Sequence, residues 1–207
     1  MITFSNLSSL SGIEHGITEK GDQAPEPFIR GEQVHKDVAV WADENTPEVV
    51  KGADAIVTRK SGIIVATFTA DCVPVLFADP KAGIVGAIHA GWRGTALEIT
   101  RKTFEFLKIR PFNIIVGIGP AICGNCFNVD EKIARQFDAS VVTESESEEG
   151  KFHVDIVQAN IDQCLEAGIP EKNIEVIRRC TFEDDALYSS RGGDKNERMI
   201  SFIRRNG

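Results

Sequence analysis

Three side chains of types that bind zinc lie at or near the ends of short apolar runs. They are His35, Cys72 and His89, and glycine, proline or aspartate residues, which interrupt strands, stand close to each. A catalytic zinc ion takes imidazole nitrogens and thiolates as three protein ligands and lowers the pKa of a water at its open position. No short ligand spacing joins the three residues. The pattern alone therefore equally allows a small buried cysteine and two structural histidines.

A second interpretation of the same residues needs no metal. Cys72 would act as a nucleophile and His89 as the base that takes its proton, as in cysteine hydrolases. The two interpretations exclude each other, because zinc would occupy the thiolate that nucleophilic attack requires.

The remaining cysteines give weaker signals. Cys123 and Cys126 form a CxxC pair, but the sequence has no second CxxC and no nearby histidine pair. We therefore interpret them as ordinary loop thiols in preference to a second metal site. Cys164 falls on the apolar face of a predicted helix and Cys180 at the end of a predicted strand, so both are assigned to the core.

Two arginines are candidates for contacts with an anion or a substrate. Arg93 lies in Gly91-Trp-Arg-Gly94, directly before a predicted helix, where free backbone amides and the helix dipole attract anions. Arg191 lies in a loop between serines and two glycines. An equally weighted alternative for Arg93 is that it pairs with an acidic side chain.

Composition limits the class of protein. The chain has 207 residues, of which 42% are hydrophobic and 26% charged, which indicates a single globular domain over residues 1–207. A net charge of −8 argues against a nucleic-acid partner, and no apolar stretch is long enough to span a membrane. Five cysteines, an odd number, favour reduced thiols and a cytoplasmic location.

Hydrophobic periodicity predicts about nine strands and four helices that do not alternate strictly, hence an α+β fold with a mixed sheet flanked by helices. The predicted strands include residues 2–7, 31–41, 53–58, 63–68, 84–88, 113–118, 174–180 and 199–203. Predicted helices begin at Thr46 and cover residues 94–110, 130–137 and 156–167. Residues 79–83 are typical of a turn, so we expect the runs 63–68 and 84–88 to form a hairpin or to be near neighbours.

Several motifs occur together in a characteristic order. They are Gln33-Val-His35, Ala70-Asp-Cys72-Val-Pro74, His89-Ala-Gly-Trp-Arg-Gly94, Gly117-Ile-Gly-Pro120 and Cys180-Thr followed by Ser190-Arg191. With them, residues 32–204 resemble the multicopper polyphenol oxidase (laccase-domain) family. Its members are also described as zinc-dependent purine nucleoside phosphorylases and adenosine deaminases and, in bacteria, as a peptidoglycan editing factor. The resemblance implies that His35, Cys72 and His89 are the metal ligands and the catalytic residues.

The resemblance also implies an activity. It is the cleavage of adenosine, inosine, guanosine and methylthioadenosine by phosphate, together with deamination of adenosine, with Arg93 or Arg191 stabilising the phosphate. Zinc is the expected metal, at one ion per chain. Copper is less favoured, because a four-copper oxidase needs on the order of ten imidazoles and the chain has four histidines. The alternatives are a hydrolase that removes misincorporated serine from peptidoglycan precursors, a polyphenol oxidase, a metal-free Cys72 hydrolase and a non-catalytic zinc protein.

Two departures from the family pattern concern the substrate. The N-terminal segment is shorter than usual, and the family's Tyr-Arg-Arg-Asp is replaced by Ser190-Arg191-Gly-Gly-Asp194, which retains one arginine. Small-molecule substrates are expected, with a monomer or small homo-oligomer as the assembly.

Overall fold

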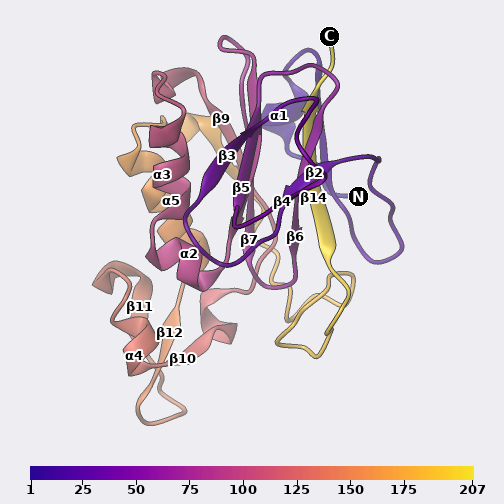
Figure 1. The fold of residues 1–207 in the computed structure, drawn as a ribbon. Coiled ribbons are helices and arrows are strands. Elements are labelled where there is room, and N and C mark those ends of the chain that lie inside the picture. Colours follow the sequence, from indigo (N-terminus) through magenta and orange to yellow (C-terminus); the bar gives the residue numbers. More distant parts are fainter.

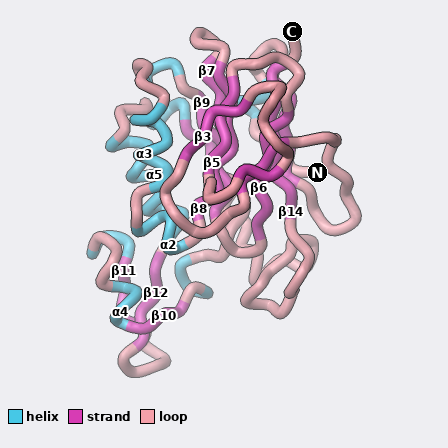
Figure 2. Tube along the Cα trace, viewed as in Figure 1, coloured by secondary structure: helices cyan, strands magenta, loops and turns pink.

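The computed structural model describes residues 1–207 and has three layers. A six-stranded sheet forms the middle layer, helices cover one of its faces, and a five-stranded sheet covers the other (Figure 1). Figure 2 shows the longer helices gathered on one side of the strands. A small three-stranded sheet with its own short helix lies beyond one end of the layers. The predicted α+β class is confirmed, with fourteen strands in three sheets in place of about nine in one.

The six-stranded sheet is mixed. Its strands, in spatial order, are β13 (Ile174–Val176), β9 (Ile115–Ile118), β7 (Val73–Asp79), β8 (Ile84–Ala90), β5 (Ala55–Thr58) and β3 (Ala39–Ala42). The outer pairs, β13 with β9 and β3 with β5, are parallel, and the inner pairs are antiparallel.

The other two sheets are smaller. The five-stranded sheet has the order β1 (Ile13–Ile17), β14 (Met199–Arg205), β6 (Ile64–Thr69), β2 (Ile29–Gly31) and β4 (Val49–Val50). The three-stranded sheet has the order β10 (Asn128–Asp130), β12 (Lys151–Val154) and β11 (Val142–Glu144).

The helices are short. They are α1 (Ser5–Ser8), α2 (Trp92–Ala96), α3 (Ile99–Phe106), α4 (Glu131–Ala134) and α5 (Ile156–Glu166). As the sequence predicts, Asp155 caps α5, its carboxylate accepting a 2.8 Å hydrogen bond from the Gln158 amide. None of the helices has the length and apolar character needed to cross a bilayer.

Strand β7 separates two hydrophobic cores. Because alternate side chains of a strand point to opposite faces, Val75 and Phe77 pack toward the helices, whereas Leu76 and Ala78 pack toward the five-stranded sheet. Both faces are buried, which explains why this stretch reads as a continuous apolar run. A rigid, doubly buried strand thus stands next to Cys72.

Residues 63–68 and 84–88 are near neighbours, as predicted, but they lie in different sheets and do not form a hairpin. The turn at residues 79–83 joins β7 to β8, with Pro74 opposite His89, and β6 instead pairs with β14 in the other sheet. Apolar periodicity cannot assign a strand to one of two stacked sheets, because strands of both sheets bury the same kinds of residue.

Residues 31–41 do not form the single predicted strand. The chain leaves β2 at Gly31 and enters β3 at Ala39, and His35 lies in the loop between them with φ of 59°. No helix begins at Thr46, in contrast to the prediction, and the strand β4 starts three residues later at Val49. Residues 2–7 form one isolated bridge at Ile2 and the start of α1 in place of a strand.

Three other elements are shorter than predicted. The helix expected over residues 94–110 is divided into α2 and α3 at Glu98, whose φ of 64° interrupts the helical backbone. The helix expected over 130–137 is the single turn of α4, and the strand expected over 174–180 ends at Val176.

Candidate metal centre

The structure brings His35, Cys72 and His89 together from three separate parts of the chain. His35 lies in the loop between β2 and β3, Cys72 directly precedes β7, and His89 lies near the end of β8. Their potential ligand atoms all lie within 4.8 Å of one another. Cys72 Sγ is 3.9 Å from His35 Nε2, and the two imidazole rings stand nearly perpendicular with centroids 4.8 Å apart. The β7–β8 pairing fixes two of the three positions on rigid scaffold.

The buried carboxylate of Asp54 organises both histidines. Its Oδ1 lies 2.9 Å from His89 Nδ1 and accepts a 2.9 Å hydrogen bond from the His35 amide. Its Oδ2 accepts a 2.8 Å hydrogen bond from the Lys36 amide. With Nδ1 donating to Asp54, the Nε2 atom of His89 is the one left for the centre. Histidine ligands of metals typically have such a carboxylate partner. Asp54 could not be identified from the sequence, because it carries no signal beyond its position just before a strand.

Two further residues allow the loop and the strands to meet. A Cβ on Gly91 would lie 2.7 Å from His35 Cδ2 and 3.0 Å from Cys72 Sγ, so only glycine fits there without displacing a ligand. The Gln33 side chain holds the His35 loop to β6: it donates to the Phe68 carbonyl at 2.6 Å and accepts from the Phe68 amide at 2.9 Å.

The pKa values of Cys72, His89 and Asp54 depend on one another. Burial disfavours the Cys72 thiolate, but hydrogen bonds and charge from His35 and His89 outweigh it and lower the pKa of Cys72 to about 6. Burial likewise disfavours the His89 imidazolium, yet Asp54 and the Cys72 thiolate raise the pKa of His89 to about 9. For Asp54 burial opposes the charged form, and the contact with His89 still lowers its pKa. At neutral pH the metal-free centre is a thiolate–imidazolium pair.

The donor set fits a thiophilic metal ion. Zinc bonds of about 2.0–2.3 Å imply that neighbouring tetrahedral ligands lie roughly 3.3–3.8 Å apart. The Cys72–His35 distance of 3.9 Å nearly meets this, and all three ligand atoms lie within 4.8 Å of one another. Two imidazoles and one thiolate suit zinc and copper alike, and they leave a fourth position for another ligand. The group is therefore capable of holding a metal.

The centre opens into a cavity of about 260 Å³. Residues lining it, besides the three candidate ligands, are Arg30, Glu32, Gln33, Phe68, Ala70, Ser190 and Arg198. The half-buried Phe68 ring lies under the Arg30 guanidinium, 4.8 Å from its centroid. Arg30 and Arg198 were not predicted from the sequence, because nothing in their neighbourhood distinguishes them from ordinary surface arginines.

The two predicted arginines lie differently. Arg93 is exposed, and its guanidinium stacks on the Trp92 ring at 4.2 Å, outside the cavity lining. Arg191 is also exposed, and its guanidinium contacts the carbonyl oxygens of Cys126 and Asn128 at 3.3 and 3.4 Å. The structure thus places neither guanidinium at the metal-capable group.

Asp71, next to Cys72, ties the Arg191 loop to the centre. It has φ of 86°, and its carboxylate accepts 2.7 Å hydrogen bonds from the hydroxyls of Thr181 and Ser189 and from the Arg191 amide. This network places Ser190 on the cavity rim. The sequence motif contains Asp71, but its role becomes visible only when the distant loop is in place.

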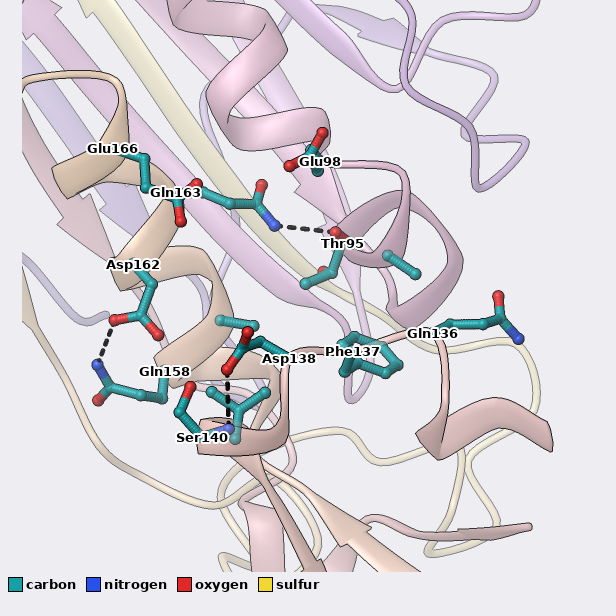
Figure 3. A pocket seen from close by; sticks show the side chains of 13 residues that line it. Thr95, Glu98, Gln136, Phe137, Asp138, Ser140, Gln158, Asp162, Gln163 and Glu166 are labelled. Atoms are coloured by element: carbon teal, nitrogen blue, oxygen red, sulfur yellow. Dashed lines mark hydrogen bonds between the residues drawn. The ribbon is translucent and has the colours of Figure 1, made fainter. Parts of the chain in front are cut away.

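A larger cavity of about 630 Å³ lies elsewhere, between α2, the segment after α4, and α5 (Figure 3). Its walls carry carboxylates and amides such as Asp138, Asp162 and Gln163, with no cysteine or histidine. Gln163 Nε2 donates to the Thr95 carbonyl at 2.8 Å, so part of this polar lining serves helix packing. The candidate metal ligands therefore make the cavity of about 260 Å³ the candidate site.

The fold and this centre define a layered α+β protein with a His₂Cys metal-capable group at the base of a cleft. The family described as multi-copper polyphenol oxidoreductase laccase matches residues 16–206, and the chain belongs to that family. The match extends beyond both ends of the 32–204 stretch on which the sequence resemblance rests.

Relatives with named activities are similar over most of the chain. The purine nucleoside phosphorylase of Deinococcus radiodurans is 39% identical, covering 87% of this chain and 71% of the relative. The one of Bacteroides thetaiotaomicron is 34% identical and covers 98% and 95%. The adenosine deaminase RL5 of an unknown prokaryotic organism is 34% identical, covering 69% and 58%.

Other relatives are longer or have known structures. This chain spans 61% of the purine nucleoside phosphorylase YlmD of Geobacillus stearothermophilus, to which it is 38% identical over 75% of its own length. The crystal structure of YlmD from that organism superposes with a TM-score of 0.84 at 29% identity, covering 99% of this chain and 94% of that one. The predicted family is therefore confirmed, and relatives of this chain are named purine nucleoside phosphorylases and an adenosine deaminase.

Proposed function

We propose that this protein is a zinc-dependent purine nucleoside phosphorylase acting on adenosine, inosine, guanosine and methylthioadenosine, with adenosine deaminase activity. The observation that carries the proposal is the convergence of His35, Cys72 and His89 at the base of a cavity that also contains two arginines and an aromatic ring. The names of its relatives supply the substrate class.

In this proposal His35, Cys72 and His89 hold the zinc ion. Bound zinc supplies a Lewis acid that polarises an oxygen of phosphate or water. Asp54 keeps the proton on Nδ1 of His89 and so leaves Nε2 free to act as a ligand. The same carboxylate fixes the backbone of the His35 loop. The chain thereby presents a preorganised centre and does not have to reorganise during the reaction.

The cavity arginines and Phe68 orient the substrates. Arg30 and Arg198 supply positive charge for phosphate, which guanidinium groups bind in a bidentate manner. The exposed part of the Phe68 ring offers a stacking surface for a purine base. Arg191 would act through the hydrogen bond that its backbone amide donates to Asp71, which holds the Ser190 loop at the cavity. Arg93 stays a predicted phosphate contact that would require its side chain to leave Trp92.

Product analysis with adenosine tests the proposal. Purified protein is incubated with adenosine with and without phosphate. We expect adenine and ribose 1-phosphate only when phosphate is present. Inosine should form in both reactions, and with phosphate part of it should be cleaved further to hypoxanthine and ribose 1-phosphate. The C72S and H89A variants should lose both activities, and H153A, which changes a histidine in β12 outside the centre, should retain them. If the protein releases none of these products but hydrolyses serine-containing peptidoglycan precursors, the editing-hydrolase alternative replaces the proposal.

Alkylation distinguishes the zinc centre from a cysteine nucleophile. If zinc holds the thiolate, Cys72 should resist iodoacetamide in metal-loaded protein and react after chelation, and activity should return when zinc is restored. A free thiolate with a lowered pKa would instead be labelled quickly, with loss of activity, in the untreated protein. Peptide mass mapping must identify the labelled residue, because Cys123 and Cys126 are also partly exposed. Elemental analysis finding several copper ions per chain in place of zinc would favour the oxidase alternative.

A further inference from the structure

A second group of potential metal ligands lies apart from the first. It consists of Cys123, Cys126, Cys180 and Glu183, whose ligand atoms all lie within 4.8 Å of one another. The sequence pattern alone assigned Cys180 to the core and the CxxC pair to an ordinary loop. The structure brings them together because Ala121 pairs with Cys180 in a parallel bridge, which aligns two segments far apart in the chain.

Backbone hydrogen bonds hold the segments that carry the three cysteines in place. The Thr181 amide donates to the Ala121 carbonyl at 3.1 Å, so the segment that carries Cys180 is anchored to the one that precedes Cys123. The Cys126 amide donates to the Cys123 carbonyl at 3.0 Å and forms the turn that places both sulfurs on one side. The site is therefore preformed, which lowers the entropic cost of binding an ion.

The acidic side chains of this group have no cationic side chain paired with them. The Cys123 amide points at Cys180 Sγ at 3.3 Å, and Cys123 Sγ is 4.0 Å from a Glu183 carboxylate oxygen. No lysine, arginine or histidine forms a salt bridge with Glu183. Burial, together with the neighbouring thiols, raises the pKa of Cys126, and burial raises that of Cys123. A divalent cation would replace the thiol protons and compensate the negative charge of all four donors.

A disulfide accounts for the group less well. It would use two of the three sulfurs and leave the third thiol and the carboxylate beside it without a role. A tetrahedral zinc ion uses all four donors, and cysteine with a carboxylate is within the range of ligands that zinc accepts. Four protein ligands leave no open position, so such a site is structural and not catalytic.

We propose that Cys123, Cys126, Cys180 and Glu183 bind a second, structural zinc ion. The ion joins the loop after β9 to the segment that runs from Cys180 toward Ser190 and Arg191. Asp71 connects that segment to Cys72 through Thr181 and Ser189. The second ion thus stabilises the loop that forms one edge of the catalytic cavity. Binding releases the thiol protons to the solvent.

Cobalt substitution tests the proposal independently of catalysis. Metal-free, reduced protein is titrated with Co²⁺, and the thiolate-to-cobalt absorption band is measured. Wild-type protein should bind two ions per chain, one at each group. C72S should lower the band by about a quarter, since one of four ligand thiolates is removed, and the second site should stay occupied. C126S should abolish one equivalent of bound cobalt and leave the Cys72 contribution to the band.

Two further variants distinguish loss of the second site from misfolding and from the loss of any cysteine. Glu183 is exposed, so E183Q should fold normally, yet it should weaken cobalt binding at the second site by about tenfold or more because an amide oxygen is a poorer donor. C164A changes a cysteine buried in the helix-side core and should leave the stoichiometry and the band unchanged. Equal cobalt binding by wild type, C126S and E183Q would overturn the proposal. A Cys123–Cys126 disulfide that persists in reductant would also overturn it.

Discussion

Replacing Asp54 by Asn tests whether the buried carboxylate builds the metal centre. The carboxylate accepts three hydrogen bonds of 2.8–2.9 Å, from the amides of His35 and Lys36 and from Nδ1 of His89. Asparagine has one acceptor oxygen, so its NH₂ group must face at least one of these donors. Uncoupling a buried, hydrogen-bonded charge pair costs about 3–5 kcal/mol. For a chain of this size we expect the Tm to fall by about 2–4 °C per kcal/mol.

Metal affinity should fall as well. A lost carboxylate partner of a ligating histidine typically weakens metal binding by about 10–100-fold. Competition with a chromophoric chelator measures this for wild type and D54N. The matched control is D79N. Asp79 is also buried and accepts two 2.8 Å hydrogen bonds from backbone amides, and it lies at the end of the β7–β8 hairpin that is far from Cys72 and His89. If D54N binds zinc within twofold of wild type, or D79N loses as much affinity, the role assigned to Asp54 is refuted.

Three further outcomes are expected. C72S should lose zinc at the catalytic centre, because a hydroxyl is a poor substitute for a thiolate, and full retention of that ion would exclude Cys72 as a ligand. G91A should weaken zinc binding by on the order of tenfold, since its Cβ would meet His35 and Cys72 at 2.7 and 3.0 Å. G52A is the control for a general loss of stability: its φ of 71° strains an alanine, but its Cβ meets no atom within 4 Å, so zinc affinity should be unchanged. Zinc affinity should rise about tenfold per pH unit between pH 6 and 9, because His89 must lose a proton while Cys72 is already ionised, and level off above 9. A pH-independent affinity over this range would contradict the assigned protonation states.

The sequence indicated the candidate ligands more clearly than their environment. His35, Cys72 and His89 could be proposed because their side chains have a recognisable chemistry and stand in motifs. Asp54, Gln33 and the cavity arginines could not, since a carboxylate, an amide or a guanidinium gains its role only from what the fold places beside it. The Cys180 sulfur illustrates this most clearly. It lies 57 positions after Cys123, and a β-bridge that no periodicity indicates brings the two together.

The fold was predicted at the level of class and of buried strands. Strands β7 and β8 are buried on every residue, so their apolar runs are unmistakable. The assignment of strands to sheets could not be predicted, and several helices and strands were predicted to be longer than they are. Thr46-Pro47 has the residues of a helix start, but the following Val49 and Val50 pair with β2, and tertiary pairing overrides the local signal.

The places where local rules failed coincide with the centre itself. Five non-glycine residues have positive φ, and three of them, Gln33, His35 and Asp71, are a candidate ligand or lie within two residues of one. Such conformations cost of order 1–3 kcal/mol each and persist only where surrounding bonds enforce them. Each here has that enforcement: Gln33 pairs with the Phe68 backbone, the His35 amide donates to Asp54, and Asp71 accepts three hydrogen bonds. A strand through residues 31–41 would have been locally cheaper, but its extended backbone would not form the loop that carries His35 to Cys72.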